Sequence, residues 1–236
     1  MNEPKDLILR PIPSKVARDF IRRTHYSGKV TQNSQVHFGA YINGELAGAL
    51  QYGPPLDRRK MAGLIIGGKP REMLELNRMA FTDALPRNSE SRAIAVSIRL
   101  IKRHVPHIRF VISFADGTQC GDGTIYRAAG FHLTSIKPNS DLCRLPSGEI
   151  IHSMTLKSSP MRPRPELGGR SFYKVTGGKN DFKAYIKAAK AEVVTGYQLR
   201  YIKLLDPTAK LAVPSIPYTE IAKRGASMYL GKRPTN

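Results

Sequence analysis

The segment Phe110-Val-Ile-Ser-Phe-Ala115 constrains the fold more than any other part of the chain. A short and almost continuous apolar run is typical of a strand that is buried on both faces, as in a mixed sheet covered by helices. A glycine-rich loop at 116–123 follows it, and a short helix is then expected at 124–129, closed by Gly130 as its C-cap. A strand, a glycine-rich loop and a helix in this order indicate an α/β fold.

A β-hairpin is the clearest of the remaining elements. Two strand-like runs, Val36–Ile42 and Leu46–Tyr52, flank the dipeptide Asn43-Gly44, which is a strong short-range signal for a hairpin turn. Further strands are expected at 7–12, 73–81, 131–133, 150–156 and 197–205. Three helices are also expected: one capped by Ser14, one capped by Ser89 that ends near residue 103, and one at 182–194.

This order of elements resembles the GNAT acetyltransferase fold, a mixed β-sheet flanked by helices. The segment Tyr126-Arg-Ala-Ala-Gly-Phe131 is similar to the Tyr-x-x-x-Gly-Phe ending of a helix in that fold. The glycine-rich phosphate loop of such enzymes is missing before residue 90, where Leu85-Pro-Arg-Asn-Ser-Glu-Ser-Arg92 stands in its place. We therefore expect a GNAT-like core at residues 1–157, a basic extension at 158–206 that packs on or completes the core, and a basic tail at 207–236.

Charge is the strongest compositional signal. The chain carries 38 Lys and Arg against 18 Asp and Glu, a formal net charge of +20. From Lys157 onward there are 16 basic and 5 acidic residues, so the last third is the most basic part per residue. Such an excess favours a polyanionic partner, and nucleic acid is the natural one. An anionic membrane surface and a merely basic soluble protein stay open as alternatives.

The chain is expected to be a soluble cytoplasmic protein without a membrane span. No apolar run approaches the roughly 18 residues that a membrane helix needs, and the N-terminus has no apolar core of a secretory signal. The two cysteines, Cys120 and Cys143, make neither a disulfide framework nor a zinc site, so they are interpreted as reduced thiols.

Six segments taken together resemble the Mom family of phage DNA-modification proteins. They follow the family order and cover roughly residues 10–205: Thr24-His-Tyr-Ser27, Glu75-Leu-Asn-Arg78, Leu85-Pro-Arg-Asn-Ser-Glu-Ser-Arg92, Ser113-Phe-Ala-Asp116, Gly123-Thr-Ile-Tyr-Arg-Ala128 and Gly196-Tyr-Gln-Leu-Arg-Tyr201. The resemblance implies a GNAT-like enzyme that converts adenine in double-stranded DNA to N6-carbamoylmethyladenine. It also implies a role in protecting phage DNA from restriction in the bacterial cytoplasm.

The implied product bears on the small-molecule donor. Direct transfer from acetyl-CoA would bond a carbonyl carbon to N6, whereas the family product has a CH2 group there. An acyl-CoA-like and a glycine-derived donor both stay open, and a metal is not excluded, although no spacing argues for one. The alternative functions are a GNAT acetyltransferase that uses acetyl-CoA on a protein amine or a small molecule, and a non-catalytic DNA-binding protein.

Asp116 and Tyr126 are the first candidate catalytic residues. Asp116 ends the buried strand at the lip of the glycine-rich loop, where its carboxylate could accept the N6 hydrogens of adenine. Its structural alternative is to cap the turn before Gly117. Tyr126 could donate a proton to a leaving group or orient that group, and its alternative is a core aromatic one turn before the Gly130 cap.

Three further candidates lie nearer the N-terminus. His25 could shuttle protons, and Tyr26 could stack on a flipped base, because base-modifying enzymes take the target out of the duplex. A hydrogen-bonded structural histidine is the alternative for His25. Arg78 lies among apolar neighbours and needs a partner, which could be a substrate carbonyl, an anionic cofactor, or Glu75 or Asp83 in an ion pair.

The cofactor-binding candidates gather at the start of the helix near residue 89. They are Arg87, Asn88, Ser89, Ser91 and Arg92. The N-terminal amides of a helix bind anions such as a pyrophosphate. The alternative is a plain N-cap at Ser89 with a solvated Arg92.

Overall fold

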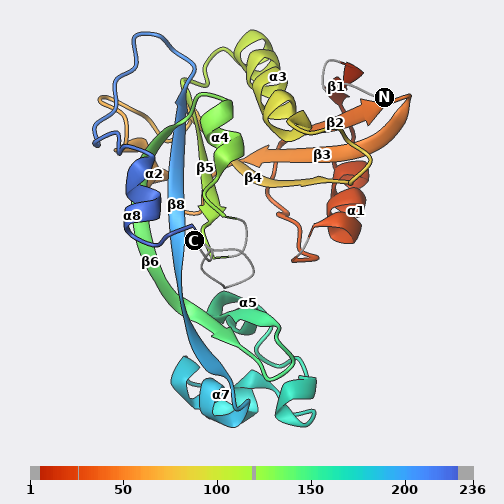
Figure 1. Ribbon diagram of the computed structural model, residues 1–236, viewed down its shortest axis with the longest axis vertical. Coiled ribbons are helices and arrows are strands. Elements are labelled where there is room, and N and C mark those ends of the chain that lie inside the picture. Colours follow the sequence, from red (N-terminus) through yellow and green to blue (C-terminus); the bar gives the residue numbers. More distant parts are fainter. Residues whose placement is uncertain (1–5, 26, 119–120, 228–236) are drawn as a thin grey trace. The chain divides into compact units, whose positions relative to one another are not determined.

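The computed structural model describes residues 6–25, 27–118 and 121–227, and these residues form two compact units (Figure 1). Unit 1 is formed by residues 6–25, 27–115, 123–135 and 200–218. Unit 2 is formed by residues 116–118, 121–122, 136–199 and 219–227. Both units are therefore discontinuous in sequence. The domains expected from the sequence, at 1–157, 158–206 and 207–236, are continuous segments, and this division stays a prediction.

In the described chain, eight strands are hydrogen-bonded in the order β1-β2-β3-β4-β5-β8-β6-β7. Their bounds in that order are Ile8–Pro11, Val36–Ile42, Glu45–Gly53, Met73–Phe81, Phe110–Asp116, Glu192–Leu204, His132–Arg144 and Ile150–His152. Strands β1 to β4 are antiparallel neighbours, whereas β4 and β5 are parallel. This mixed sheet with flanking helices confirms the expected α/β class.

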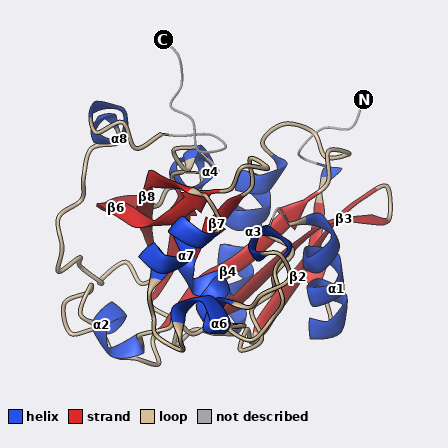
Figure 2. Ribbon diagram, turned by 90° about the horizontal axis from the view of Figure 1, so that it is seen from below, coloured by secondary structure: helices blue, strands red, loops and turns tan. Residues whose placement is uncertain are grey.

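Two helices cover opposite faces of the sheet in unit 1. Helix α1, Ser14–Thr24, packs Phe20 and Ile21 against the small residues Ala49 of β3 and Ala80 of β4. Figure 2 shows α1 beside β2, β3 and β4. On the other face, Ser97 of helix α3, Ser89–His104, lies 2.6 Å from the Tyr52 hydroxyl of β3. The two short helices of unit 1 are α2, Arg58–Ala62, and α4, Thr124–Ala128.

The β2–β3 hairpin forms as predicted. Asn43 and Gly44 have φ angles of 51° and 81°, the left-handed pair that a two-residue turn between twisted strands requires. The predicted cap at Ser14 is wrong. Pro13 precedes the first turn, Ser14 is already helical, and no side chain caps the helix. The prediction of a helical segment closed by Gly130 is confirmed, since Gly130 has a φ of 73° just after α4.

Unit 2 has its own hydrophobic core. Tyr185 and Phe172 pack there with Cys143, Leu156 and Leu167. Its helical elements are α5 at Ser153–Lys157, a 3-10 turn at Pro165–Leu167, α6 at Phe172–Thr176, α7 at Phe182–Ala188 and α8 at Thr219–Lys223.

Two predicted elements of unit 2 have wrong ends. The strand expected at 150–156 stops at His152, because the His152 ring accepts the Met154 amide and caps α5. The helix expected at 182–194 stops at Ala188, and Lys190 follows with a φ of 51°. The β-branched residues beyond it, including Val194, belong to β8.

Candidate functional site

A β-bulge in β4 organises the polar cluster of unit 1. Gln51 pairs with Arg78 and Tyr52 pairs with Leu76, so Asn77 is an extra residue on β4. Side chains alternate between faces along a strand, and the bulge resets this alternation. Glu75 and Arg78 therefore share the face of Gln51, which is the face that α1 covers. In a regular strand, two residues three positions apart would point to opposite faces.

Arg78 is a half-buried cation without an ion pair in the described chain. Its Nη1 donates to the Asn77 carbonyl at 2.8 Å, whereas its buried Nε has no hydrogen-bond partner among the described residues. The ion pairs considered for it, with Glu75 or Asp83, are not formed. On the neighbouring strand, the buried Oε1 of Gln51 also lacks a partner in the described chain. This pair of unused groups suits a ligand that has both a hydrogen-bond acceptor and a donor.

His25 lies just after α1 and is held as a neutral ring. Its Nδ1 accepts a hydrogen bond from the Ser27 amide at 3.1 Å, and the Ser27 hydroxyl lies 2.9 Å away. Burial, and then the charge of Arg78, lower the pKa of the His25 imidazole to about 4. A neutral ring whose Nδ1 accepts carries its proton on Nε2. At neutral pH, His25 therefore carries its proton on Nε2, and its role as a proton shuttle stays a prediction.

Two polar neighbours of Arg78, Asn77 and Gln51, were not among the candidates from the sequence, whereas Glu75 was considered as its ion-pair partner. Burial raises the pKa of the Glu75 carboxyl, while an Asn77 hydrogen bond and the Arg78 charge oppose this rise. The Ser34 hydroxyl donates to the Asn77 side chain at 3.0 Å. Glu75 and Asn77 belong to the quoted segment Glu75–Arg78, so their signal was present, whereas Gln51 carries no local signal.

Tyr126 lies in an aromatic cluster of unit 1. Its side chain is 6% exposed, stacks on Tyr201 with ring centroids 5.0 Å apart, and meets Phe131 edge-on. Burial raises the pKa of the Tyr52 phenol, and the Tyr126 phenol adds to that rise. Tyr52 points away from the face of Arg78, so the two phenols lie on the α3 side of the sheet.

Two more candidates lie outside this cluster. Asp116, the last residue of β5, belongs to unit 2, where its Oδ1 accepts the Thr118 amide at 3.0 Å. This hydrogen bond shows that Asp116 caps the turn. A catalytic role for its carboxylate stays a proposal. Tyr26 lies outside the described residues.

The start of α3 differs from the expected cap. Asn88, with a φ of 71°, precedes the helix and does not cap it through its side chain. Ser89 is the first helical residue, and its hydroxyl donates to the Pro86 carbonyl at 2.6 Å. The Ser91 hydroxyl donates to the Asn88 carbonyl at 3.0 Å. The Ser89 amide donates to the Pro86 carbonyl at 3.2 Å, and no side chain caps the amides that follow it in the first turn, which suits an anion beside the exposed Arg87.

Comparisons with known proteins place the chain in a family. The model of the Mom protein family matches residues 6–220. The methylcarbamoylase Mom of Escherichia phage Mu is 32% identical over 209 residues, which cover 87% of this chain and 78% of that protein. The chain belongs to the Mom family. The predicted resemblance is thereby confirmed.

Solved structures of acetyltransferases are similar to this Mom-family chain. A Bacillus subtilis acetyltransferase in complex with CoA has a TM-score of 0.43 at 11% identity, and covers 84% of this chain and 97% of its own. A GNAT-family acetyltransferase from Elizabethkingia anophelis with acetyl-CoA bound has a TM-score of 0.40 at 12% identity, and covers 84% and 98%.

Two features are absent from the residues that the structure of this Mom-family chain describes. No group of three or more His, Cys, Asp or Glu side chains is placed there to hold a metal ion. No helix in those residues has both the length and the apolar character needed to cross a bilayer.

Proposed function

We propose that this Mom-family protein transfers a carbamoylmethyl group to N6 of adenine in double-stranded DNA, and that the product, N6-carbamoylmethyladenine, protects phage DNA from restriction. The observation that carries the proposal is the 32% identity over 209 residues with a protein named as a methylcarbamoylase. The reaction would take place in the cytoplasm of the bacterial host.

The distribution of charge supports DNA as the substrate. Seven exposed cations lie between residues 157 and 190 of unit 2: Arg162, Arg170, Lys174, Lys179, Lys183, Lys187 and Lys190. The acids of this segment have internal partners. Glu166 accepts the Tyr185 hydroxyl at 2.6 Å, and Asp181 accepts the Ala184 amide as the cap of α7. The cations are therefore uncompensated at the surface, which suits phosphate binding.

The polar cluster of unit 1 supports recognition of the transferred group. A carbamoylmethyl group ends in an amide, which has one acceptor oxygen and two donor hydrogens. Arg78 is a donor for the oxygen, and the unused Oε1 of Gln51 is an acceptor for an N–H. We assign His25 and Arg78 to this role, in which they orient the amide of the transferred group while its CH2 carbon bonds to N6.

The other proposed roles concern the adenine. Its N6 is a poor nucleophile and is paired in the duplex, so the base would be flipped out of the helix. We assign Asp116 as the acceptor of the N6 hydrogens, Tyr26 as a stacking surface, and Tyr126 as the group that donates a proton to the leaving group or orients it.

The first turn of α3 is the proposed site for the donor molecule. The uncapped amides and the residues Arg87, Asn88, Ser89, Ser91 and Arg92 fit the phosphates of an acyl-CoA-like donor. A glycine-derived donor would place its carboxylate there instead. The bound donor supplies the carbon that is transferred, and the chain supplies the orientation.

The test is mass spectrometry of nucleosides from plasmid DNA of bacteria that express the protein. We expect an adenosine that is heavier by one carbamoylmethyl group. Asp116→Asn keeps an oxygen for the Thr118 amide but removes the charge, so the turn should survive while the modified nucleoside falls at least about 100-fold, the size of a typical acid–base contribution.

The matched control is Asp141→Asn, at an exposed position of β6, which should modify DNA as the wild type does. Wild-type levels of product in Asp116→Asn would remove Asp116 from the catalytic set. An acetylated protein or small molecule, together with unmodified DNA, would replace the proposal by an ordinary acetyltransferase activity.

A further inference from the structure

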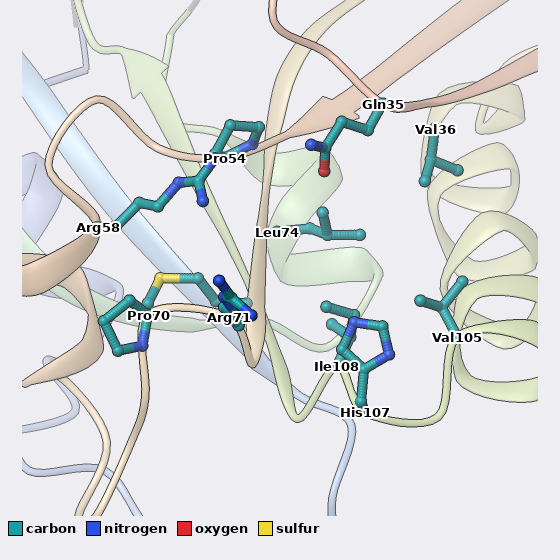
Figure 3. Close-up of a pocket in the computed structure, with 11 residues that line it drawn as sticks. Gln35, Val36, Pro54, Arg58, Pro70, Arg71, Leu74, Val105, His107 and Ile108 are labelled. Carbon is teal, nitrogen blue, oxygen red and sulfur yellow. The ribbon is translucent and has the colours of Figure 1, made fainter.

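A pocket of about 320 Å³ lies in unit 1, where β4 begins (Figure 3). Arg58 at the start of α2 and Arg71 before β4 stand on one side of it. His107, between α3 and β5, stands on the other side, and Leu74 of β4 lies between them. Three separate segments thus bring two guanidinium groups and an imidazole to one cavity.

The two arginines of the pocket keep their charge uncompensated. No acidic residue lines the cavity, and neither Arg58 nor Arg71 makes an ion pair or a side-chain hydrogen bond within the described chain. Each arginine is next in sequence to an acidic residue whose side chain binds a different group. Asp57 accepts the Lys60 amide as the cap of α2, and Glu72 binds Arg109 at 3.2 Å.

The floor of the pocket is apolar. Met73 and Leu74 of β4 and Ile108 before β5 are each 4% exposed or less, and they form the floor under the charged rim. Cations above an apolar floor match a ligand that combines a phosphate with a sugar or a base. Arginine suits such a ligand because its planar fork holds phosphate oxygens in pairs.

The pocket is close to the proposed chemistry. Leu74, in the pocket, is four residues from Arg78 on the same strand, which at a rise of about 3.3 Å per residue puts their Cα atoms about 13 Å apart. Leu74 precedes Glu75 and points to the opposite face of β4 from Glu75 and Arg78, so the pocket lies on the α3 side of the sheet. The segment Ser34-Gln35 connects the two places, because Ser34 binds Asn77 of the bulge and Gln35 lines the pocket.

We propose that this pocket binds a phosphodiester of the bound DNA, with Arg58 and Arg71 as the phosphate ligands. The proposal rests on the proposed function for the identity of the DNA. Phosphate contacts of this kind fix the register of a DNA strand and carry no sequence information.

The experiment is a salt titration of DNA affinity with purified full-length protein. Arg58→Gln/Arg71→Gln is compared with Arg99→Gln/Lys102→Gln, which removes two exposed cations of α3 that do not line the pocket. Loss of two phosphate contacts should lower the slope of log K against log salt by about 1.8 and weaken binding on the order of 30-fold at 0.15 M salt. The control pair should change both quantities much less.

A variant that keeps the charges and a measurement of stability make the result specific. Arg58→Lys/Arg71→Lys keeps the charges and should retain most of the slope. Thermal unfolding should be unchanged, because both arginines are exposed and unpaired in the described chain. Equal losses in the pocket and control variants, or a wild-type slope in the pocket variant, would overturn the proposal.

A last arm separates DNA from a small phosphorylated ligand. If the pocket variant binds DNA normally but loses affinity for adenosine 3′,5′-bisphosphate, the site takes a small molecule and the DNA assignment is wrong. Failure of the proposed function would be detected in a different measurement, the analysis of plasmid nucleosides. In that case plasmid adenosine stays unmodified by the wild type, while the salt slope still depends on Arg58 and Arg71.

Discussion

At the scale of single residues, the proposed site depends on groups kept in an unusual state by burial. His25 stays neutral because its ring is largely desolvated and faces the charge of Arg78. Its Nδ1 accepts the Ser27 amide, so the neutral ring carries its proton on Nε2. A donor that is fixed in a partly dry site orients a bound group without reorganisation.

The neutral state of His25 predicts a pH dependence of stability. Its pKa is about 4 in the folded chain and about 6.5 when unfolded, so between these values the unfolded chain binds more protons. Stability should therefore fall as the pH falls through this window. Urea unfolding at pH 7.5 and pH 5 should show a smaller loss for His25→Gln than for the wild type, by on the order of 1 kcal/mol after allowance for partial exposure.

The matched control for this prediction is His104→Gln, which changes an exposed histidine at the end of α3. It should lose as much stability as the wild type does between the two pH values. An equal loss in His25→Gln would mean that the ring is protonated in the folded protein, and its assignment as a donor through Nε2 alone would be wrong.

At the scale of elements, a bulge and a glycine position the polar groups. The bulge at Asn77 brings Glu75 and Arg78 to one face of β4. In unit 2, Gly196 of β8 lies against the loop after Asp116. A Cβ at this position would overlap the Thr118 hydroxyl, which accepts the Tyr197 amide at 3.0 Å. Thr118 is fully buried and its amide binds Asp116, so the glycine keeps this turn in place.

Gly196→Ala should therefore destabilise the protein by about 1–3 kcal/mol, the usual cost of overpacking a buried position. Gly63→Ala is the control, because the nearest atom to a Cβ there is 3.6 Å away. Urea unfolding measures both variants. If Gly196→Ala were as stable as Gly63→Ala, the loop would be free to move from β8, and the turn at Asp116 would not depend on this contact.

The elements also show what local sequence can predict. The hairpin at Asn43-Gly44 follows from two residues, and the strands β4 and β5 follow from their apolar runs, because these signals are local. The ends predicted for β7 and α7 were wrong, since a histidine cap of α5 and the strand pairing of β8 decided them. The family segments located His25, Arg78 and Asp116, but Gln51 joins the site only through its register with Arg78.

At the scale of the whole molecule, the charge of +20 is a property of the surface. Several acids have hydrogen-bond or ion-pair partners within the described residues. Glu72 and Asp206 both bind Arg109, and the Thr208 hydroxyl, with Arg109 next, holds the pKa of Asp206 at about 2. With the acids bound to helix caps and ion pairs, the excess cations face solvent. Repulsion among them is relieved when a polyanion binds, so the electrostatics favour a polyanionic partner.

The exposed lysines of α6 and α7 and the segment between them should therefore contribute to DNA binding. Replacing Lys174, Lys179, Lys183 and Lys187 by Gln should lower the salt slope of binding by at least about 1, since each lost phosphate contact removes about 0.9. A variant with four exposed cations of unit 1 replaced, Arg23, Arg99, Lys102 and Lys210, has the same net charge. Fluorescence anisotropy with a duplex at several salt concentrations compares the two. Equal slopes would mean that only the total charge matters, whereas a lower slope in the first variant would assign backbone contacts to unit 2.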